Sequence, residues 1–234
     1  GIESSTILIN GFGDDAKIGD KTVPVNGLWA SSDFFNVFSG FNLIKGNPAT
    51  ALSAPNSIVL TEDAAYKIFA DDDPLGQTIQ LGEDKPYTVT GLMENPPHNS
   101  HLNFESLGSF ITYENEMKLD TDNNNWLGWG NMWSNYAYVV LDENTSAEQV
   151  NQHLKNISDE ENKKNDRVTI NVSLQALGEI MPGEELSNNI GLSMDTKVLW
   201  LLSGLTFIVI LSAGFNYTNL SIARSLRRAK EVGV

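Results

Sequence analysis

Twenty-six consecutive residues without a charged side chain, Val198 to Ala223, constrain this chain more than any other feature. The hydrocarbon core of a bilayer is roughly 30 Å thick and needs about 20 apolar residues in a helix. The apolar centre, Val198 to Phe215, nearly fills that length, and Trp200 and Tyr217 lie near the two ends, as interfacial aromatics do. A buried helix of a soluble protein is the alternative, but such a helix usually carries a polar stripe. The sequence therefore predicts a transmembrane helix over residues 197–223.

Small residues inside this segment would let a second helix approach closely. They are Ser203, Gly204, Ser212, Ala213 and Gly214. The helix is expected to run from about Asp195 to Lys230, which is roughly 50 Å at 1.5 Å per residue and therefore longer than the bilayer. The surplus is expected to project as a rigid rod on at least one side.

Charge is distributed unevenly along the chain. The segment 224–234 holds four basic residues and one acid, namely Arg224, Arg227, Arg228, Lys230 and Glu231. The formal net charge is −15, so residues 1–197 carry −18 once the +3 of this segment is removed. Basic residues collect on the cytoplasmic side of a span. We therefore expect a cytoplasmic stub over 224–234 and an extracytoplasmic domain over 1–196.

The strong acidity of the outer domain argues against nucleic acid as a partner, because nucleic-acid binding needs a basic footprint. Two interpretations of the acidity stay open. It can simply keep the domain soluble, or it can form a docking face for a cationic ligand.

Strands and helices are expected to interleave irregularly in the outer domain. β-Branched and alternating runs predict strands over residues 5–10, 21–28, 57–61, 78–81, 87–92, 135–141 and 168–174. Pro24 favours an edge position for its strand because proline has no N–H to donate. This mixture predicts the α+β fold class.

Hydroxyl side chains mark the expected helix starts. Ser31 or Ser32 would cap a short helix that ends at Phe38, and Thr61 would cap the helix Glu62–Phe69. Ser146 would cap an amphipathic helix through Ile157, with Val150, Leu154 and Ile157 on its apolar face.

The stretch 121–133 has no strand or helix period and reads as a loop. It contains three tryptophans, Trp126, Trp129 and Trp133, and four asparagines. Clustered aromatics on a loop can form a recognition surface. They can equally fill a small hydrophobic core, and the sequence leaves both interpretations open.

Few residues suggest chemistry. The absence of cysteine excludes disulfides, thiolate metal sites and cysteine nucleophiles. His98 and His101 form a His-x-x-His pair, but flanking prolines and the lack of an adjacent helix disfavour a metal site. Neither a Gly-x-Ser-x-Gly elbow nor a phosphate-binding Gly-x-x-x-x-Gly-Lys-[Ser/Thr] loop occurs. We therefore predict no catalytic residue, cofactor or metal in this chain, and no ATP hydrolysis by it.

Several segments, taken together in their order, carry a family resemblance. They are Ser32–Phe38, Leu43–Leu52, Asn56–Glu62, Asp73–Ile79, Tyr87–Leu92, Asn99–Phe104, Asn216–Ser225 and Arg228–Gly233. As a set they resemble the MacB/FtsX-type ABC transporter permeases, in the form common in Bacteroidetes. The Trp-rich loop is the part that does not map onto the family.

The resemblance implies a two-lobed periplasmic domain followed by one long transmembrane helix. A mostly β lobe, inserted at about residues 13–112, would interrupt a porter-like α/β lobe made of about 5–12 and 113–185. The family's permease also has a first transmembrane helix before this domain and two further helices after the second one. The chain is therefore expected to be a fragment of such a subunit.

The resemblance also implies a mechanical function. A separate cytoplasmic ATPase would dimerise on ATP, and the second helix would transmit that motion to the periplasmic lobes to drive substrate export. Arg224, Arg227, Arg228, Lys230 and Glu231 would lie at the ATPase contact. Further expected partners are the bilayer of the bacterial inner membrane, a second permease subunit in a homodimer or heterodimer, and a periplasmic adaptor or substrate. The rival hypothesis is a membrane-anchored sensor or ligand-binding module.

Overall fold

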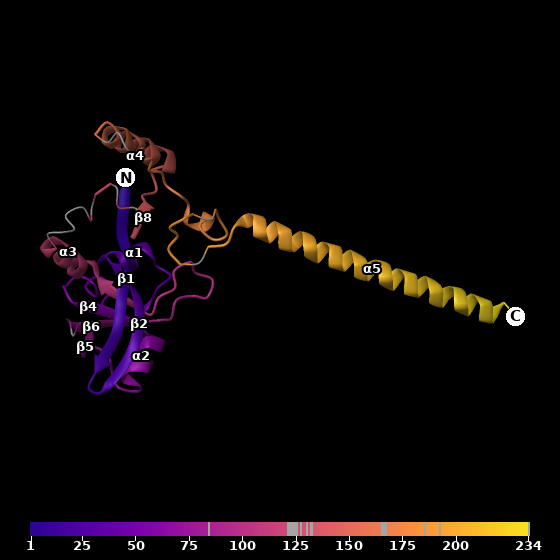
Figure 1. The fold of residues 1–234 in the computed structure, drawn as a ribbon, viewed down its shortest axis with the longest axis horizontal. Coiled ribbons are helices and arrows are strands. Elements are labelled where there is room, and N and C mark those ends of the chain that lie inside the picture. Colours follow the sequence, from indigo (N-terminus) through magenta and orange to yellow (C-terminus); the bar gives the residue numbers. More distant parts are fainter. Residues whose placement is uncertain are drawn as a thin grey trace. The chain divides into compact units, whose positions relative to one another are not determined.

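The computed structural model describes residues 1–83, 85–120, 126, 128–129, 131, 133–164, 168–184, 186–191 and 193–233, without the side chains of 229–232. The chain divides into two compact units (Figure 1). The first comprises Gly1–Ala176 and Ser187–Leu192, and the second comprises Leu177–Leu186 and Ser193–Val234.

One mixed β-sheet organises the first unit. Within the described residues its eight strands are β1 (Ile2–Ile18), β2 (Lys21–Ala30), β3 (Leu43–Gly46), β4 (Ser57–Thr61), β5 (Thr78–Leu81), β6 (Lys85–Met93), β7 (Ser106–Ser109) and β8 (Asn135–Leu141). The order is β2-β7-β4-β6-β5-β1-β8, with β3 on β6, and β1 also pairs with β2. The path from β2 to β1 therefore returns to its start, as in a barrel.

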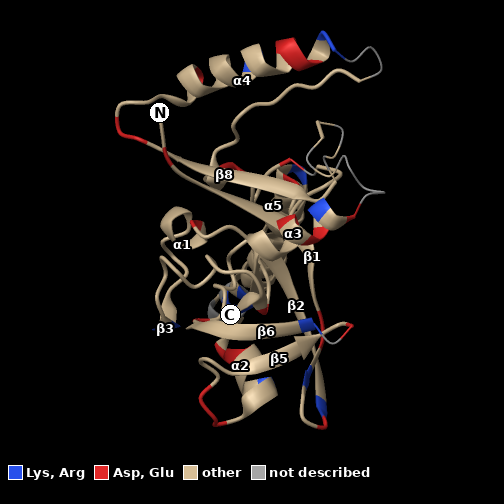
Figure 2. Cartoon of the chain, turned by 90° about the vertical axis from the view of Figure 1, so that its left-hand side faces the viewer, with Lys and Arg blue, Asp and Glu red and all other residues tan. Residues whose placement is uncertain are grey.

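Side chains that alternate along the strands form two hydrophobic clusters. In β4 every residue is buried, with Ile58 and Leu60 in one cluster and Val59 in the other. Helix α2 (Glu62–Phe69) adds Ala64, Ala65, Ile68 and Phe69 to the first cluster. The short helix α1 (Phe34–Val37) adds Phe34 and Phe35 to the second. Figure 2 shows α2 beside β5 and β6, away from α1.

Most of the predicted elements are present. The strands expected at 5–10, 21–28, 57–61, 78–81, 87–92 and 135–141 lie within β1, β2, β4, β5, β6 and β8. Thr61 caps α2 by accepting a hydrogen bond from the amide of Ala64. Ser146 forms a capping box with Gln149 at the start of α4 (Ala147–Asn162). The α+β fold class is confirmed.

The predicted edge position of Pro24 agrees with the strand pairing. Pro24 lies opposite Asp15 of β1, whereas β2 meets β7 only from Gly27 to Ala30. The half of β2 that contains the proline therefore has a single neighbouring strand, β1. On its opposite edge there is no strand that would need a hydrogen bond from the N–H that proline lacks.

Two details of the predicted helices are wrong. Asp33, not Ser31 or Ser32, precedes α1, and it makes no side-chain capping bond. The hydroxyl of Ser31 instead lies 2.8 Å from that of Thr6 and accepts from the amide of Ile7. In α4 the buried positions are Val150 and Ser158, whereas Ile157 is 46% exposed. The buried face of α4 therefore keeps Val150 and Leu154 of the predicted stripe but continues to Ser158 instead of Ile157.

The strand predicted at 168–174 is also wrong, because side chains of α4 take the place of a partner strand. Three backbone amides of the segment donate to them: Ile170 to Asn162 Oδ1 at 2.7 Å, Val172 to Ser158 Oγ at 3.1 Å, and Leu174 to Asn151 Oδ1 at 2.7 Å. Asn162 Nδ2 also donates to the carbonyl of Ile170 at 2.8 Å. Sequence alternation reports the side-chain pattern but not whether a neighbouring strand is available.

β1 bends at a bulge where the predicted lobes would meet. Its register with β2 shifts between Asn10 and Phe12, and Gly11 and Gly13 have positive φ angles of 94° and 109°. The predicted boundary at residue 13 therefore falls inside β1, which would be shared by both lobes. The division into an inserted lobe at 13–112 and a porter-like lobe at 5–12 and 113–185 stays a prediction.

The second unit is dominated by helix α5 (Thr196–Val232), which spans 37 residues. Asp195 caps it, and its carboxylate accepts from the amide of Lys197 at 2.8 Å. A short 3-10 turn, η2 (Leu177–Glu179), precedes the helix, and the amide of Gly183 donates to the carbonyl of Met194 at 3.1 Å. At 1.5 Å per residue α5 is about 55 Å long, slightly more than the predicted length of roughly 50 Å, because it continues to Val232.

Candidate functional site

Helix α5 presents an apolar surface that the rest of the chain does not cover. Residues 201–228 are all exposed, and Leu205, Ile208 and Phe215 each expose more than half of their surface. Among the described residues, Thr196–Arg228 is the one helix long and apolar enough to cross a membrane. An uncovered apolar cylinder of this length has lipid as its natural surroundings.

Two threonine side chains of α5 make their hydrogen bonds inside the helix. The hydroxyl of Thr206 donates to the carbonyl of Leu202 at 2.8 Å, and that of Thr218 donates to the carbonyl of Gly214 at 2.9 Å. Threonine hydroxyls bonded to the preceding turn leave no unpaired donor in a hydrocarbon environment. These residues are therefore compatible with a membrane span.

The five predicted helix-packing residues do not share one face of α5. A helix turns about 100° per residue, so Ser203 and Gly214 lie within about 20° of each other, while Gly204, Ser212 and Ala213 point in other directions. Thr218, Ser221 and Ser225 fall near Ser203 and Gly214 on the same projection. The helical period thus groups Ser203 and Gly214 of the predicted set with Thr218, Ser221 and Ser225 on one face, and packing against a second helix stays a prediction.

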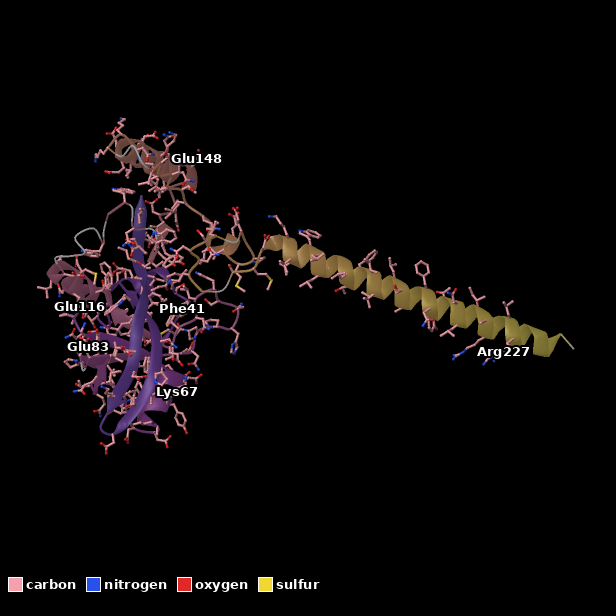
Figure 3. All side chains as sticks on the ribbon, viewed as in Figure 1. Phe41, Lys67, Glu83, Glu116, Glu148 and Arg227 are labelled. Carbon is pink, nitrogen blue, oxygen red and sulfur yellow. The ribbon has the colours of Figure 1, made fainter. Side chains whose placement is uncertain are left out.

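Three arginines gather on one side of α5 near its C-terminal end. Arg224, Arg227 and Arg228 span about 100° of the helix surface and, with Ser221 and Ser225, line a shallow depression. Figure 3 shows the side chain of Arg227 projecting from the helix. In the part of the chain that the structure describes, none of the three is in an ion pair. The predicted contacts at Lys230 and Glu231 lie outside the described side chains.

The tryptophans of the loop 121–133 are in different environments. Trp126 is 7% exposed and packs on Tyr113 and Phe110, with ring centroids 5.7 and 6.4 Å apart. Trp129 and Trp133 are 45% and 70% exposed. The structure therefore gives Trp126 a packing position, while Trp129 and Trp133 stay the candidates for a recognition surface.

The two histidines of the His-x-x-His pair are also in different environments. His98 is exposed, whereas His101 is 9% exposed and its Nε2 lies 3.1 Å from the hydroxyl of Tyr138. Burial lowers the pKa of His101. In the described residues, histidines and carboxylates form no cluster of three or more that could hold a metal ion.

Comparison with known proteins identifies the outer domain. Residues 2–157 match the family model of the MacB-like periplasmic core domain. The Macrolide export ATP-binding/permease protein MacB of Aggregatibacter actinomycetemcomitans is 25% identical over 225 residues, which cover 93% of this chain and 31% of that protein. The protein of the same description from Vibrio parahaemolyticus is 24% identical over 218 residues, covering 92% and 30%. The chain thus spans about a third of the length of these curated relatives.

A solved structure of related sequence supports the same assignment. A domain assigned to a permease protein of Porphyromonas gingivalis superposes with a TM-score of 0.54 at 27% sequence identity, over 68% of this chain and 65% of that one. The resemblance to MacB-type permeases is confirmed, and a periplasmic domain followed by an apolar helix indicates the inner membrane. This chain belongs to the family of MacB-like periplasmic core domains, the periplasmic part of ABC-transporter permeases.

Proposed function

We propose that this chain is part of a permease subunit that couples ATP hydrolysis by a separate cytoplasmic ATPase to conformational change in the periplasm and to substrate export. The observation that carries the proposal is the single uninterrupted helix α5, whose apolar body leads directly to three arginines that form no ion pair with any described side chain. A continuous helix transmits displacement along its axis without a hinge. It therefore suits the mechanical transmission that export without a channel requires.

The proposed orientation places the outer domain in the periplasm and residues 224–234 in the cytoplasm. The concentration of arginine at one end of the span supports it, because basic residues are retained on the cytoplasmic side. The stripe of Ser203, Gly214, Thr218, Ser221 and Ser225 supports contact with a further helix, either of the same subunit or of a second permease subunit in a dimer.

The proposal also specifies that the ATPase is a polypeptide separate from the permease. The curated relatives are described as ATP-binding/permease proteins, so in them the nucleotide-binding part belongs to the same polypeptide. This chain has no phosphate-binding loop, and its C-terminal arginines are placed to meet an acidic surface of another domain or subunit. A periplasmic adaptor is a further proposed partner, for which Trp129 and Trp133 are the exposed aromatic candidates.

The sensor alternative rests on the same helix. An outer domain that captures a ligand could pass a displacement through α5 to a signalling domain. The match to permease relatives over more than nine-tenths of the chain favours the transporter.

The deciding experiment measures ATP hydrolysis in membranes that contain the full-length permease and its candidate ATPase. Charge reversal by Arg227→Glu/Arg228→Glu should abolish the stimulation of ATPase activity by the permease. The matched control is Lys163→Glu/Lys164→Glu, which reverses two exposed charges at the end of α4. Loss of stimulation in the stub variant alone supports the coupling. A permease that neither binds nor stimulates any ATPase would instead favour the sensor.

A further inference from the structure

A pocket of about 230 Å³ opens in the outer domain, between the bulge of β1, the β5–β6 turn and helix α3 (Phe110–Leu119). None of its lining residues comes from α5, so the pocket belongs entirely to the first unit. Ligand sites for drug-sized molecules usually occupy about 300–1,000 Å³. This pocket is therefore suited to a small molecule or to a single side chain.

Aromatic rings form the inner wall of the pocket. The centroid of Phe12 lies 4.5 Å from that of Trp29 and 5.6 Å from that of Tyr87, and those of Trp29 and Tyr87 are 6.5 Å apart. All three residues are at most 7% exposed and line the pocket. Aromatic faces attract cations through their quadrupole, most strongly when the site is desolvated.

The hydroxyl of Tyr87 is the polar group of this wall. Tyr87 as a whole is 3% exposed, and no described residue forms a hydrogen bond with its hydroxyl. Among the described residues no fully buried polar side-chain atom lacks a partner, so this oxygen reaches the solvent of the pocket. Burial and then the negative charge of Glu116 raise the pKa of Tyr87 to about 12, so the phenol stays neutral. A solvent-accessible tyrosine hydroxyl at the wall of a pocket is available to a ligand.

The rim of the pocket is acidic. Asp14, Glu83 and Glu116 line it together with a single base, Lys85. Lys85 Nζ lies 2.8 Å from Glu116 Oε1, so this ammonium is already paired. Among the described residues, Asp14 and Glu83 have no cationic partner. Figure 3 shows Glu83 and Glu116 on the same side of the outer domain, while Glu148 lies apart on α4.

Three clustered aromatic rings, one of them the neutral phenol of Tyr87, and an excess of two carboxylates together favour one ligand chemistry. We propose that this pocket binds an organic cation, an ammonium or guanidinium group carried on a short apolar body. The apolar body would lie against Phe12 and Trp29, and the cation would meet Glu83, Asp14 and the Tyr87 oxygen. The exposed Lys85–Glu116 pair is of a kind worth only about 0–1 kcal/mol, so a ligand cation can compete for Glu116.

Two sources of such a cation are possible, a free amine or an arginine side chain of a peptide. Isothermal titration of the full chain in detergent would use benzylammonium for the first and an N-acetylated Gly-Arg-Gly amide for the second, so that its citrulline counterpart, also N-acetylated, is neutral. Benzyl alcohol and the citrulline peptide are the neutral counterparts. Binding of either cation that its neutral counterpart lacks supports the proposal and identifies the source. Failure of both cations, or equal binding of the neutral compounds, overturns it.

Substitutions then assign the binding to this pocket. Asp14→Asn/Glu83→Gln should weaken binding of the cation at least fivefold, and Tyr87→Phe should weaken it severalfold. Glu148→Gln, an exposed acid outside the pocket, should leave it unchanged. Lys85→Met should tighten binding, because it removes the competing ammonium, and a gain of affinity cannot come from unfolding. If the acid variants and the separate Lys85→Met variant all bind the cation with unchanged affinity, any binding occurs outside this pocket. This result is independent of the ATPase experiment, since the pocket involves no residue of α5.

Discussion

His101 Nε2 lies 3.1 Å from the hydroxyl of Tyr138, which joins the loop before β7 to strand β8. The same loop approaches residue 191, where a Cβ atom on Gly191 would lie 1.7 Å from the carbonyl oxygen of His101. Tyr138 therefore holds the His101 ring, while Gly191 packs against the His101 backbone, and the residue is 9% exposed. Its protonation becomes a measure of how tightly this part of the outer domain is packed.

Outer-domain stability should fall as His101 becomes protonated. Burial lowers the pKa of His101 in the folded chain below its ordinary value of 6.5, so the unfolded chain binds the proton more tightly. The contribution is fully present above pH 6.5 and is lost as the pH falls from 6.5 toward the lower folded pKa. Melting temperatures of the full chain between pH 7.5 and 5.5 should decline for wild type, and less for His101→Gln. His98→Gln, at an exposed position, is the control that should decline like wild type.

Alanine substitutions at two glycines of β1 should distinguish the destabilisation caused by backbone strain from that caused by steric conflict. Gly11 and Gly13 both have positive φ, where an alanine costs of order 1–3 kcal/mol. A Cβ at Gly13 would also lie 2.1 Å from the carbonyl oxygen of Val25, whereas one at Gly11 meets no atom within 4 Å. Gly13→Ala should therefore lower the melting temperature clearly more than Gly11→Ala. Equal losses in the two variants would mean that β1 and β2 separate easily at the bulge.

Removal of the Asn162 side chain should release the segment 168–174 from α4. Asn162→Ala deletes both hydrogen bonds to Ile170, one to its amide and one from the side-chain amide to its carbonyl. Leaving part-buried backbone groups unpaired costs about 1–3 kcal/mol. Hydrogen exchange at the Ile170 amide should accelerate roughly tenfold or more. Asn156→Ala, which loses only a bond to Gln152 within α4, is the matched control and should leave Ile170 protected.

The proposed orientation of α5 can be measured because the chain contains no cysteine. A single Ser225→Cys should react with a membrane-impermeant maleimide only after permeabilisation of the inner membrane. Ser173→Cys, at an exposed position of the outer domain, should react without it. Reaction of Ser225→Cys from the periplasmic side would reverse the proposed topology.

Local signals in the sequence were sufficient to predict most of the helices and strands. Thr61 and Ser146 begin their helices as predicted, because a capping side chain needs only the three residues that follow it. The length and position of α5 follow from an uninterrupted apolar run, which can be recognised without knowing what the helix packs against. The acidic character of the outer domain and the basic end of α5 are also properties of composition.

Other features depended on contacts between distant residues. The alternation at 168–174 predicted a strand, but its hydrogen-bond partners are Asn151, Ser158 and Asn162 of α4. Trp126 and Trp129 are equivalent in sequence, yet only Trp126 meets Tyr113 and Phe110. Such differences are decided by which surfaces remain uncovered after folding, and a residue's own neighbours in the chain do not contain that information.

The sequence by itself determined the membrane helix, the helix caps, most of the strands and the family, because each rests on local pattern or on ordered similarity along the chain. Tertiary structure alone decided the pocket, because Phe12, Trp29, Tyr87 and Glu116 come from four separate elements. Their convergence follows from β1 pairing with both β2 and β5, which brings residues about one hundred positions apart to a common wall. Pairing between strands that are distant in the sequence creates sites of this kind, and the local pattern of polar and apolar residues does not predict that pairing.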